Sequence, residues 1–86
     1  MLGSLKEDVL LAVVAAGMDQ PSATIFELVD EARKEYGFGS VSFGSVFTTL
    51  ERLAKEKMVT VKKAKSESGR LQKLFTITGK GRAALS

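Results

Sequence analysis

The sequence contains no cysteine and no histidine, and it has one proline and no tryptophan among 86 residues. Without cysteine there is no disulfide framework and no thiolate metal site. Without histidine, most zinc sites and most proton-transfer chemistry lose their usual ligand or base. The longest apolar run, Val9–Ala16, is far shorter than the roughly 20 residues needed to span a bilayer. These absences predict a cytoplasmic protein that is not an enzyme, has no metal or cofactor, and does not bind membranes.

The charge of the chain is unevenly distributed. Hydrophobic residues make up 44% of the sequence, so we expect one globular domain over residues 1–86. Residues 1–40 carry three basic and seven acidic side chains, whereas residues 41–86 carry ten basic and three acidic ones. This asymmetry indicates a surface that binds a polyanion. The alternative is chance clustering on a solvated surface.

A first helix is predicted over residues 5–16. Ser4 and Glu7 fit a capping box in front of it, and Gly17 is a natural C-terminal stop. The helix is apolar around much of its circumference. It is therefore either deeply buried or partly used for pairing with a second subunit.

A second helix follows a turn predicted at residues 18–22, because proline cannot continue a helix. Ser22 or Thr24 is its expected N-cap. The exposed side of this helix is mostly acidic and therefore unsuited to phosphates. The glycine-containing stretch 36–40 ends it.

A third helix, over residues 43–57, is the element on which the functional prediction rests. Val41 is expected to form a short strand of one or two residues, and Ser42 to be the N-cap. Apolar residues recur with helical period along one face of this helix, and the opposite face carries small polar side chains. Such a surface fits the major groove of DNA, and its predicted base-reading residues are Ser42, Gly44, Ser45, Thr48 and Thr49. The glycine permits close approach either of a phosphate or of the second helix.

After the third helix the hydrophobic period changes to that of strands. Residues 59–65 and 71–77 predict an antiparallel hairpin with an apolar base and a basic tip, and Thr78 is the expected N-cap of a short last helix. The predicted phosphate and wing contacts are Arg52, Lys55, Lys62, Lys63, Lys65, Arg70 and Lys73. Arg70 is also the candidate for an adjacent, A·T-rich minor groove.

This order of elements is typical of a winged helix-turn-helix, an α+β fold with a three-helix core, a two-stranded wing and a short C-terminal helix. We predict sequence-specific binding of double-stranded DNA, with helix 43–57 in the major groove and wing 59–77 on the backbone or minor groove. The alternative is a protein-interaction module without DNA binding. A homodimer through the first and last helices is expected, with Leu5, Val9, Val13, Ala84 and Leu85 as candidate contacts.

Two stretches carry a family resemblance: V-S-F-G-S-V-F-T-T-L-E-R-L-A-K-E-K-M-V and S-G-R-L-Q-K-L-F-T-I-T-G-K-G-R-A-A-L. They resemble the PadR family of bacterial transcriptional regulators. The resemblance implies a winged-helix repressor that binds a palindromic operator as a dimer.

The sequence departs from the family pattern at four points. Gln20–Ala23 stands where a glycine-tyrosine motif opens the second helix, and Leu74-Phe75 stands where the family has paired aromatic residues. Lys57 replaces a glycine after the third helix. Many members also continue into C-terminal helices that dimerise and help to form an effector pocket. A minimal or truncated member is therefore expected, and the sequence leaves any effector unknown.

Overall fold

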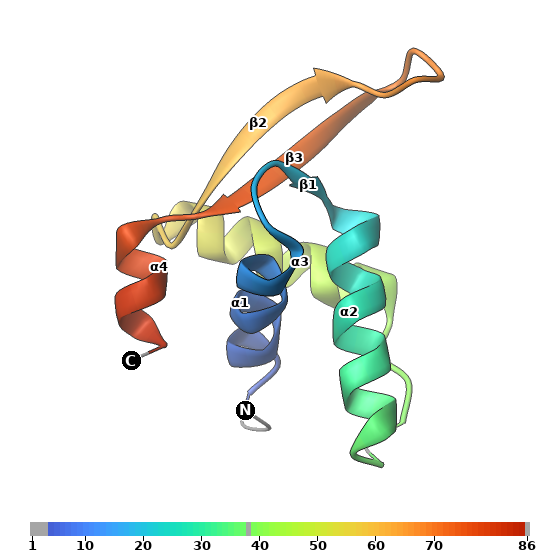
Figure 1. Ribbon diagram of the computed structural model, residues 1–86, viewed down its shortest axis with the longest axis vertical. Coiled ribbons are helices and arrows are strands. Elements are labelled where there is room, and N and C mark those ends of the chain that lie inside the picture. Colours follow the sequence, from blue (N-terminus) through green and yellow to red (C-terminus); the bar gives the residue numbers. More distant parts are fainter. Residues whose placement is uncertain (1–3, 38, 86) are drawn as a thin grey trace.

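The computed structural model describes residues 4–37 and 39–85, so residues 1–3, Phe38 within the predicted turn, and residue 86 lie outside the described part. Within it, four helices surround a core capped by a three-stranded antiparallel sheet (Figure 1). The elements are α1 (Leu5–Ala16), β1 (Gln20–Pro21), α2 (Ser22–Glu35), α3 (Phe43–Lys55), β2 (Val59–Lys65), β3 (Leu71–Ile77) and α4 (Gly79–Ala84). This arrangement confirms the predicted α+β winged helix.

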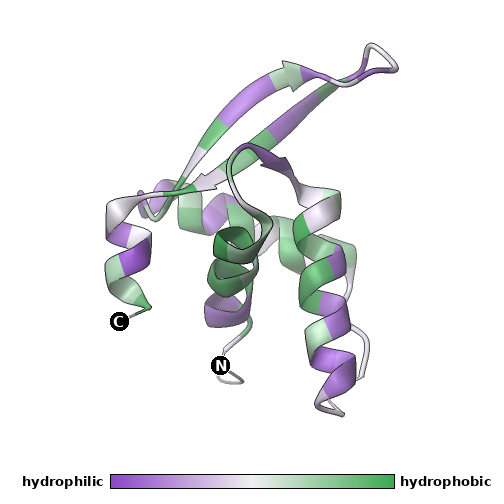
Figure 2. Ribbon diagram, in the orientation of Figure 1, coloured by the Kyte–Doolittle hydropathy of each residue, from purple (hydrophilic) through white to green (hydrophobic). Residues whose placement is uncertain are grey.

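The core is formed around α1, which packs against α2, α3 and β3. The Ser4 hydroxyl accepts the Glu7 N–H at 3.1 Å and caps the helix as predicted. Hydrophobic residues are concentrated on the helices, and the outer half of the wing is mainly hydrophilic (Figure 2). The buried core residues are Val9, Leu10, Ala12, Val13, Ile25, Val29, Val46, Leu50, Leu53, Val59 and Phe75. None of the described helices is long and apolar enough to cross a membrane.

Complete burial within the chain corrects part of the predicted dimer contact. Val9 is 0% exposed and Val13 is 1% exposed. Neither side chain has surface left with which to contact a second copy. Of the two roles open for the apolar first helix, burial is the one that these residues fulfil.

One carboxylate is also buried in this core. Asp8 is 2% exposed, and its Oδ2 lies 2.5 Å from Nη1 of Arg33 on α2. Removing Arg33 would leave the Asp8 carboxylate buried without this cation, which destabilises the fold. The pair therefore fixes α2 against α1.

The short strand lies elsewhere in the chain than predicted. Val41 is in no strand, and the segment predicted as a turn supplies β1 instead. Gln20 pairs with Phe75 and Pro21 with Leu74, both in β3. The sheet order β1-β3-β2 makes β1 an edge strand, where the missing N–H of proline is tolerated.

The start of α2 also differs from the capping prediction. Pro21 is the N-cap, with φ −73° and ψ 159° and no side-chain cap hydrogen bond. Ser22 and Thr24 are therefore both wrong as caps. Pairing with β3 already holds Pro21 extended, so the helix begins at the next residue.

The helix α3 ends at Lys55, earlier than the predicted end at residue 57. The N–H groups of Lys57 and Met58 donate to the carbonyls of Ala54 and Leu53, at 3.1 and 2.9 Å. This pair of hydrogen bonds is a Schellman motif, which needs positive φ at its C′ residue. Lys57 has φ 65° and stands where the family pattern has glycine. The departure thus keeps the turn and places a lysine in a conformation that favours glycine.

The wing is the predicted antiparallel hairpin. Val59 pairs with Ile77 at its base, and Lys63 pairs with Lys73 further out. The last helix begins at its predicted cap, because the Thr78 hydroxyl accepts the Gly81 N–H at 3.0 Å.

Gly81 packs α4 directly against the base of the wing. A Cβ at this buried position would lie 2.2 Å from the carbonyl oxygen of Met58 and 2.6 Å from Cδ1 of Ile77. Only glycine fits without displacement of the backbone.

We predict that Gly81→Ala lowers the free energy of unfolding by about 1–3 kcal/mol, because the added methyl group overpacks this junction. Gly79→Ala on the same helix is the matched control, since nothing lies within 4 Å of a Cβ there. Denaturant unfolding of both variants tests the prediction. Equal unfolding midpoints would contradict it.

Asp30 holds the connection between α2 and α3. Its Oδ2 lies 2.9 Å from Lys34 Nζ, and its Oδ1 accepts the Val41 N–H at 3.4 Å. The hydrogen bond from Lys34 lowers the pKa of Asp30, helped by the Val41 amide and opposed by desolvation. The charged form is therefore favoured by the folded state.

We expect Asp30 to make stability dependent on pH in the acid range. A carboxyl with a lowered folded-state pKa stabilises the fold fully above its unfolded value of about 3.9, and this contribution is lost as pH falls through the folded-state pKa. Asp30→Asn should therefore destabilise the protein near neutral pH and have a smaller effect in strong acid. Urea unfolding at several pH values measures this, with Glu31→Gln as the control. An effect of Asp30→Asn that does not change with pH would contradict it.

Candidate nucleic-acid interface

The predicted base-reading residues form one continuous surface at the start of α3. All five, Ser42, Gly44, Ser45, Thr48 and Thr49, line a shallow hollow beside Leu5 of α1. The core stripe of Val46, Leu50 and Leu53 lies on the other side of the helix. The structure thus brings together the residues that the sequence singled out, and we call this surface the hydroxyl hollow.

Several hydroxyls of the hydroxyl hollow are engaged within the helix. Ser42 Oγ accepts the Ser45 N–H at 3.1 Å and donates to Ser45 Oγ at 2.7 Å. Thr49 Oγ1 donates to the Ser45 carbonyl at 2.8 Å. A hydroxyl has one donor and two acceptor lone pairs, so Ser42 and Thr49 remain available as acceptors. Thr48, which is exposed, has no hydrogen bond from its hydroxyl within the described residues.

Further along α3, Arg52 and Lys55 line a second hollow together with Thr48 and Glu51. Glu51 is exposed, and sequence reasoning did not include it. Helical spacing from Thr48 and Lys55 would have indicated it, because residues three and four apart share a helix face. Its Oε2 accepts from Lys73 Nζ at 3.3 Å and so connects α3 to the wing.

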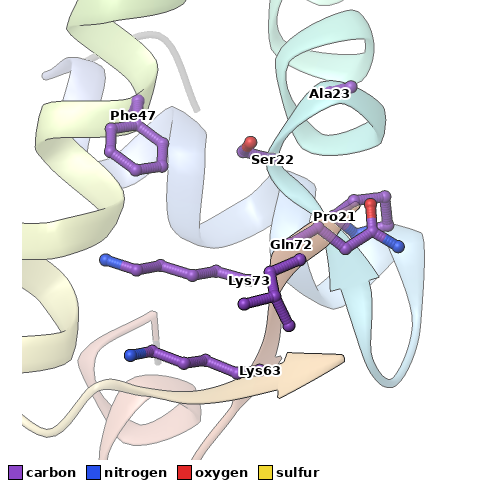
Figure 3. A pocket seen from close by; sticks show the side chains of 8 residues that line it. Pro21, Ser22, Ala23, Phe47, Lys63, Gln72 and Lys73 are labelled. Carbon is purple, nitrogen blue, oxygen red and sulfur yellow. The ribbon is translucent and has the colours of Figure 1, made fainter. Parts of the chain in front are cut away.

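A cleft of about 430 Å³ opens between the wing and the start of α2 (Figure 3). It is lined by Pro21, Ser22, Ala23, Phe47, Lys63, Leu71, Gln72 and Lys73. We call it the wing cleft. The side chains of Lys63 and Lys73, which face each other across the β2–β3 ladder, both extend toward α3 (Figure 3). Lys73 Nζ lies 5.7 Å from the centroid of the Phe47 ring.

The wing cleft concentrates positive charge. Two ammonium groups share it with the first turn of α2, whose N–H groups have no side-chain cap. Uncapped helix N-termini and lysines both favour anions. Gln72 adds an amide, and Phe47 and Leu71 give the cleft apolar walls. Sequence reasoning missed Phe47 and Gln72 because the cleft forms only where the folded chain brings α2, α3 and the wing together.

The remaining predicted wing residues lie outside the wing cleft. Lys62 is on the other side of the hairpin, with Nζ 3.8 Å from Oδ2 of Asp19. Asp19 is itself joined to Thr76, whose Oγ1 accepts its N–H at 2.8 Å and donates to its Oδ1 at 3.0 Å. Lys65 and Arg70 are exposed at the outer end of the hairpin. The structure therefore separates Lys62 from Lys63 and Lys73.

The other candidate dimer residues lie in two places: Ala84 and Leu85 beside α1, and Leu5 beside the hydroxyl hollow. Ala84 and Leu85 line a shallow pocket with Leu10 of α1. Leu85 and Leu5 pack partly against the core, whereas Ala84 is exposed. These three residues have surface available, so their role in dimer formation stays a prediction.

The family model described as "Transcriptional regulator PadR-like family" matches residues 14–86. The chain belongs to the PadR-like family. A PadR-like transcriptional regulator from Bacillus cereus strain ATCC 14579 has 30% sequence identity and a TM-score of 0.65 over 94% of this chain and 73% of that one. No curated protein matches the sequence.

More distant solved structures of the PadR family share the fold. Bacillus subtilis PadR in complex with operator DNA has 20% identity and a TM-score of 0.77, with 94% of this chain and 44% of that chain covered. A PadR-like transcription factor from Bacteroides fragilis has 22% identity and a TM-score of 0.67, with 91% and 71% covered. This chain therefore spans less than half of the length of Bacillus subtilis PadR.

Proposed function

We propose that this PadR-family protein is a repressor that binds double-stranded DNA with sequence specificity. In this proposal α3 enters the major groove and the wing contacts the adjacent backbone or minor groove. The supporting observation is that two surfaces suited to DNA both open along α3. Gly44 and Thr48 line the hydroxyl hollow, and Phe47 lines the lysine-containing wing cleft.

The two surfaces have different roles in the proposed complex. Lysine and arginine contacts to phosphates supply affinity without sequence information. Lys63 and Lys73 in the wing cleft, Arg52 and Lys55 on α3, and the exposed wing residues supply those contacts. Hydroxyl oxygens and the threonine methyl group in the hydroxyl hollow read base edges. That Bacillus subtilis PadR was crystallised with operator DNA supports DNA binding by this chain.

Arg70 is proposed for the minor groove, where a narrow A·T-rich segment attracts guanidinium groups. It is exposed next to the turn that joins the two wing strands. We further propose a homodimer in which Leu5, Ala84 and Leu85 contribute contacts, because palindromic sites match two-fold symmetric proteins.

The second candidate function is docking of a protein partner. An apolar groove between α1 and α2, lined by residues that include Leu11, Ala15 and Leu28, favours it. Salt distinguishes the two functions. Each phosphate contact adds about −0.9 to the slope of log affinity against log salt, whereas an apolar interface is much less sensitive.

We predict that Lys63→Glu and Arg70→Glu each weaken binding to duplexes selected from a random pool, and that the double variant abolishes it. Each lost phosphate contact should make the slope of log affinity against log salt less negative by about 0.9. Neither substitution should lower thermal stability, because Lys63→Glu replaces a like-charge pair with Lys73 by an opposite-charge pair and Arg70 is exposed. Fluorescence anisotropy measures both affinity and salt slope.

The matched control for each single variant is Lys80→Glu on α4, which lies at the end of the molecule away from the wing tip (Figure 1). This substitution makes the same change in net charge. Equal losses in Lys63→Glu and Lys80→Glu would remove the wing cleft from the proposal. Failure of the wild-type chain to bind any duplex would remove the proposed function.

Glu51→Gln should increase affinity for duplex DNA, because it releases Lys73 from its ion pair. An exposed pair of this kind is worth up to about 1 kcal/mol, so the gain should not exceed about fivefold. Glu35→Gln at the end of α2 is the control for charge alone. The same gain in both variants would contradict the role given to the ion pair.

A further inference from the structure

Phe43, the first residue of α3, is an aromatic ring held in place yet open to solvent. It is 46% exposed. Its ring meets that of Phe26 on α2 edge-on, with centroids 5.5 Å apart and an interplanar angle of 63°. On its other side it is nearly parallel to the ring of Phe47, at 6.4 Å and 13°. Contacts of this kind favour one ring orientation.

The position of Phe43 distinguishes it from other exposed apolar side chains. The large exposed hydrophobic residues in the described part are Met18, Tyr36, Phe43, Val61 and Leu71. Of these, Phe43 alone lies on α3. Ser42 and Gly44 on either side of it line the hydroxyl hollow, and its stacking partner Phe47 lines the wing cleft. Phe43 therefore lies between the two proposed DNA-contacting surfaces.

The chemical groups that base pairs present in the major groove indicate which of them an apolar ring at this position would contact. The C5 methyl group of thymine is the apolar feature that the major groove offers, and phenylalanine is among the side chains that contact it. In helix-turn-helix proteins the N-terminal residues of the recognition helix contact base edges. Because the ring is already positioned, little side-chain entropy is lost when it makes this contact.

We propose that Phe43 reads the C5 methyl group of a thymine, and that the sequence bound by this protein requires thymine at that position. This inference rests on the proposed binding of DNA in the major groove. It adds an aromatic, methyl-dependent contact to the recognition that the hydroxyl and threonine methyl groups of the hydroxyl hollow supply.

The test uses a duplex selected by the wild-type chain from a random pool. Each thymine is replaced in turn by deoxyuridine, which removes only the methyl group. One replacement should weaken binding about fourfold, which corresponds to burial of one methyl group. Cytosine at that position should also bind more weakly, and 5-methylcytosine should recover part of the loss.

Two variants connect this thymine to Phe43. Phe43→Ala should bind the thymine and deoxyuridine duplexes equally, and it should leave responses to the other replacements unchanged. Phe43→Leu, which keeps an apolar side chain and more of the contact with Phe26, should retain a preference for thymine. Met18→Ala, a truncation of an exposed apolar residue outside α3, is the control and should behave as the wild type. Thermal melts establish that each variant is folded.

The possible outcomes separate this inference from the proposed function. Wild-type binding that no deoxyuridine replacement weakens would overturn the role of Phe43 and leave the DNA-binding proposal intact. The same holds if Phe43→Ala and the wild type lose equal affinity at the same thymine. Absence of wild-type binding to every duplex would overturn the proposed function and this inference with it.

Discussion

The geometry of the wing depends on a set of hydrogen bonds around the carbonyl group of Met58. This oxygen accepts the N–H of Thr78 at 3.1 Å, and the Thr78 hydroxyl is shared between the carbonyls of Lys57 and Met58, at 2.8 and 3.0 Å. The Met58 N–H closes the turn that ends α3, and Gly81 lies against the same carbonyl. The end of α3, both strands of the wing and the start of α4 thus meet at one residue, Met58. A change there would alter the angle between the α3 surface and the wing.

Elements whose signals are local in the sequence are the ones that the sequence predicts well. The helix α1, the start of α3 and the two strands of the wing follow from hydrophobic period and from the caps Ser4, Ser42 and Thr78. Pairing of Gln20–Pro21 with β3 is not local, because its partners lie near the other end of the chain. Turn chemistry around a proline therefore suggested a loop, and the same pairing displaced the start of α2.

The candidate site likewise has one part that the sequence predicts and one part that it does not. Residues of the hydroxyl hollow are close in sequence and share one helix surface, so helical spacing predicts them together. The wing cleft joins α2, α3 and both wing strands, and only the folded chain brings Lys63 and Phe47 to the same space. Burial also decides which apolar residues are free to bind. Val9 and Val13 have a pattern that fits either core or interface, and tertiary packing assigns them to the core.

Charge repulsion destabilises the wing of the free protein and favours binding of the proposed partner, which is an anion. Lys63 and Lys73 face each other directly across the ladder, and like charges in this arrangement destabilise a sheet by a few tenths to about 1 kcal/mol. The ion pair of Lys73 with Glu51 offsets part of this repulsion. In the proposed complex a phosphate in the wing cleft would offset more, because one anion neutralises both ammonium groups. An anion bound in the wing cleft would thus relieve a repulsion that destabilises the free wing. This relief would make the free energy of DNA binding more favourable in the proposed complex.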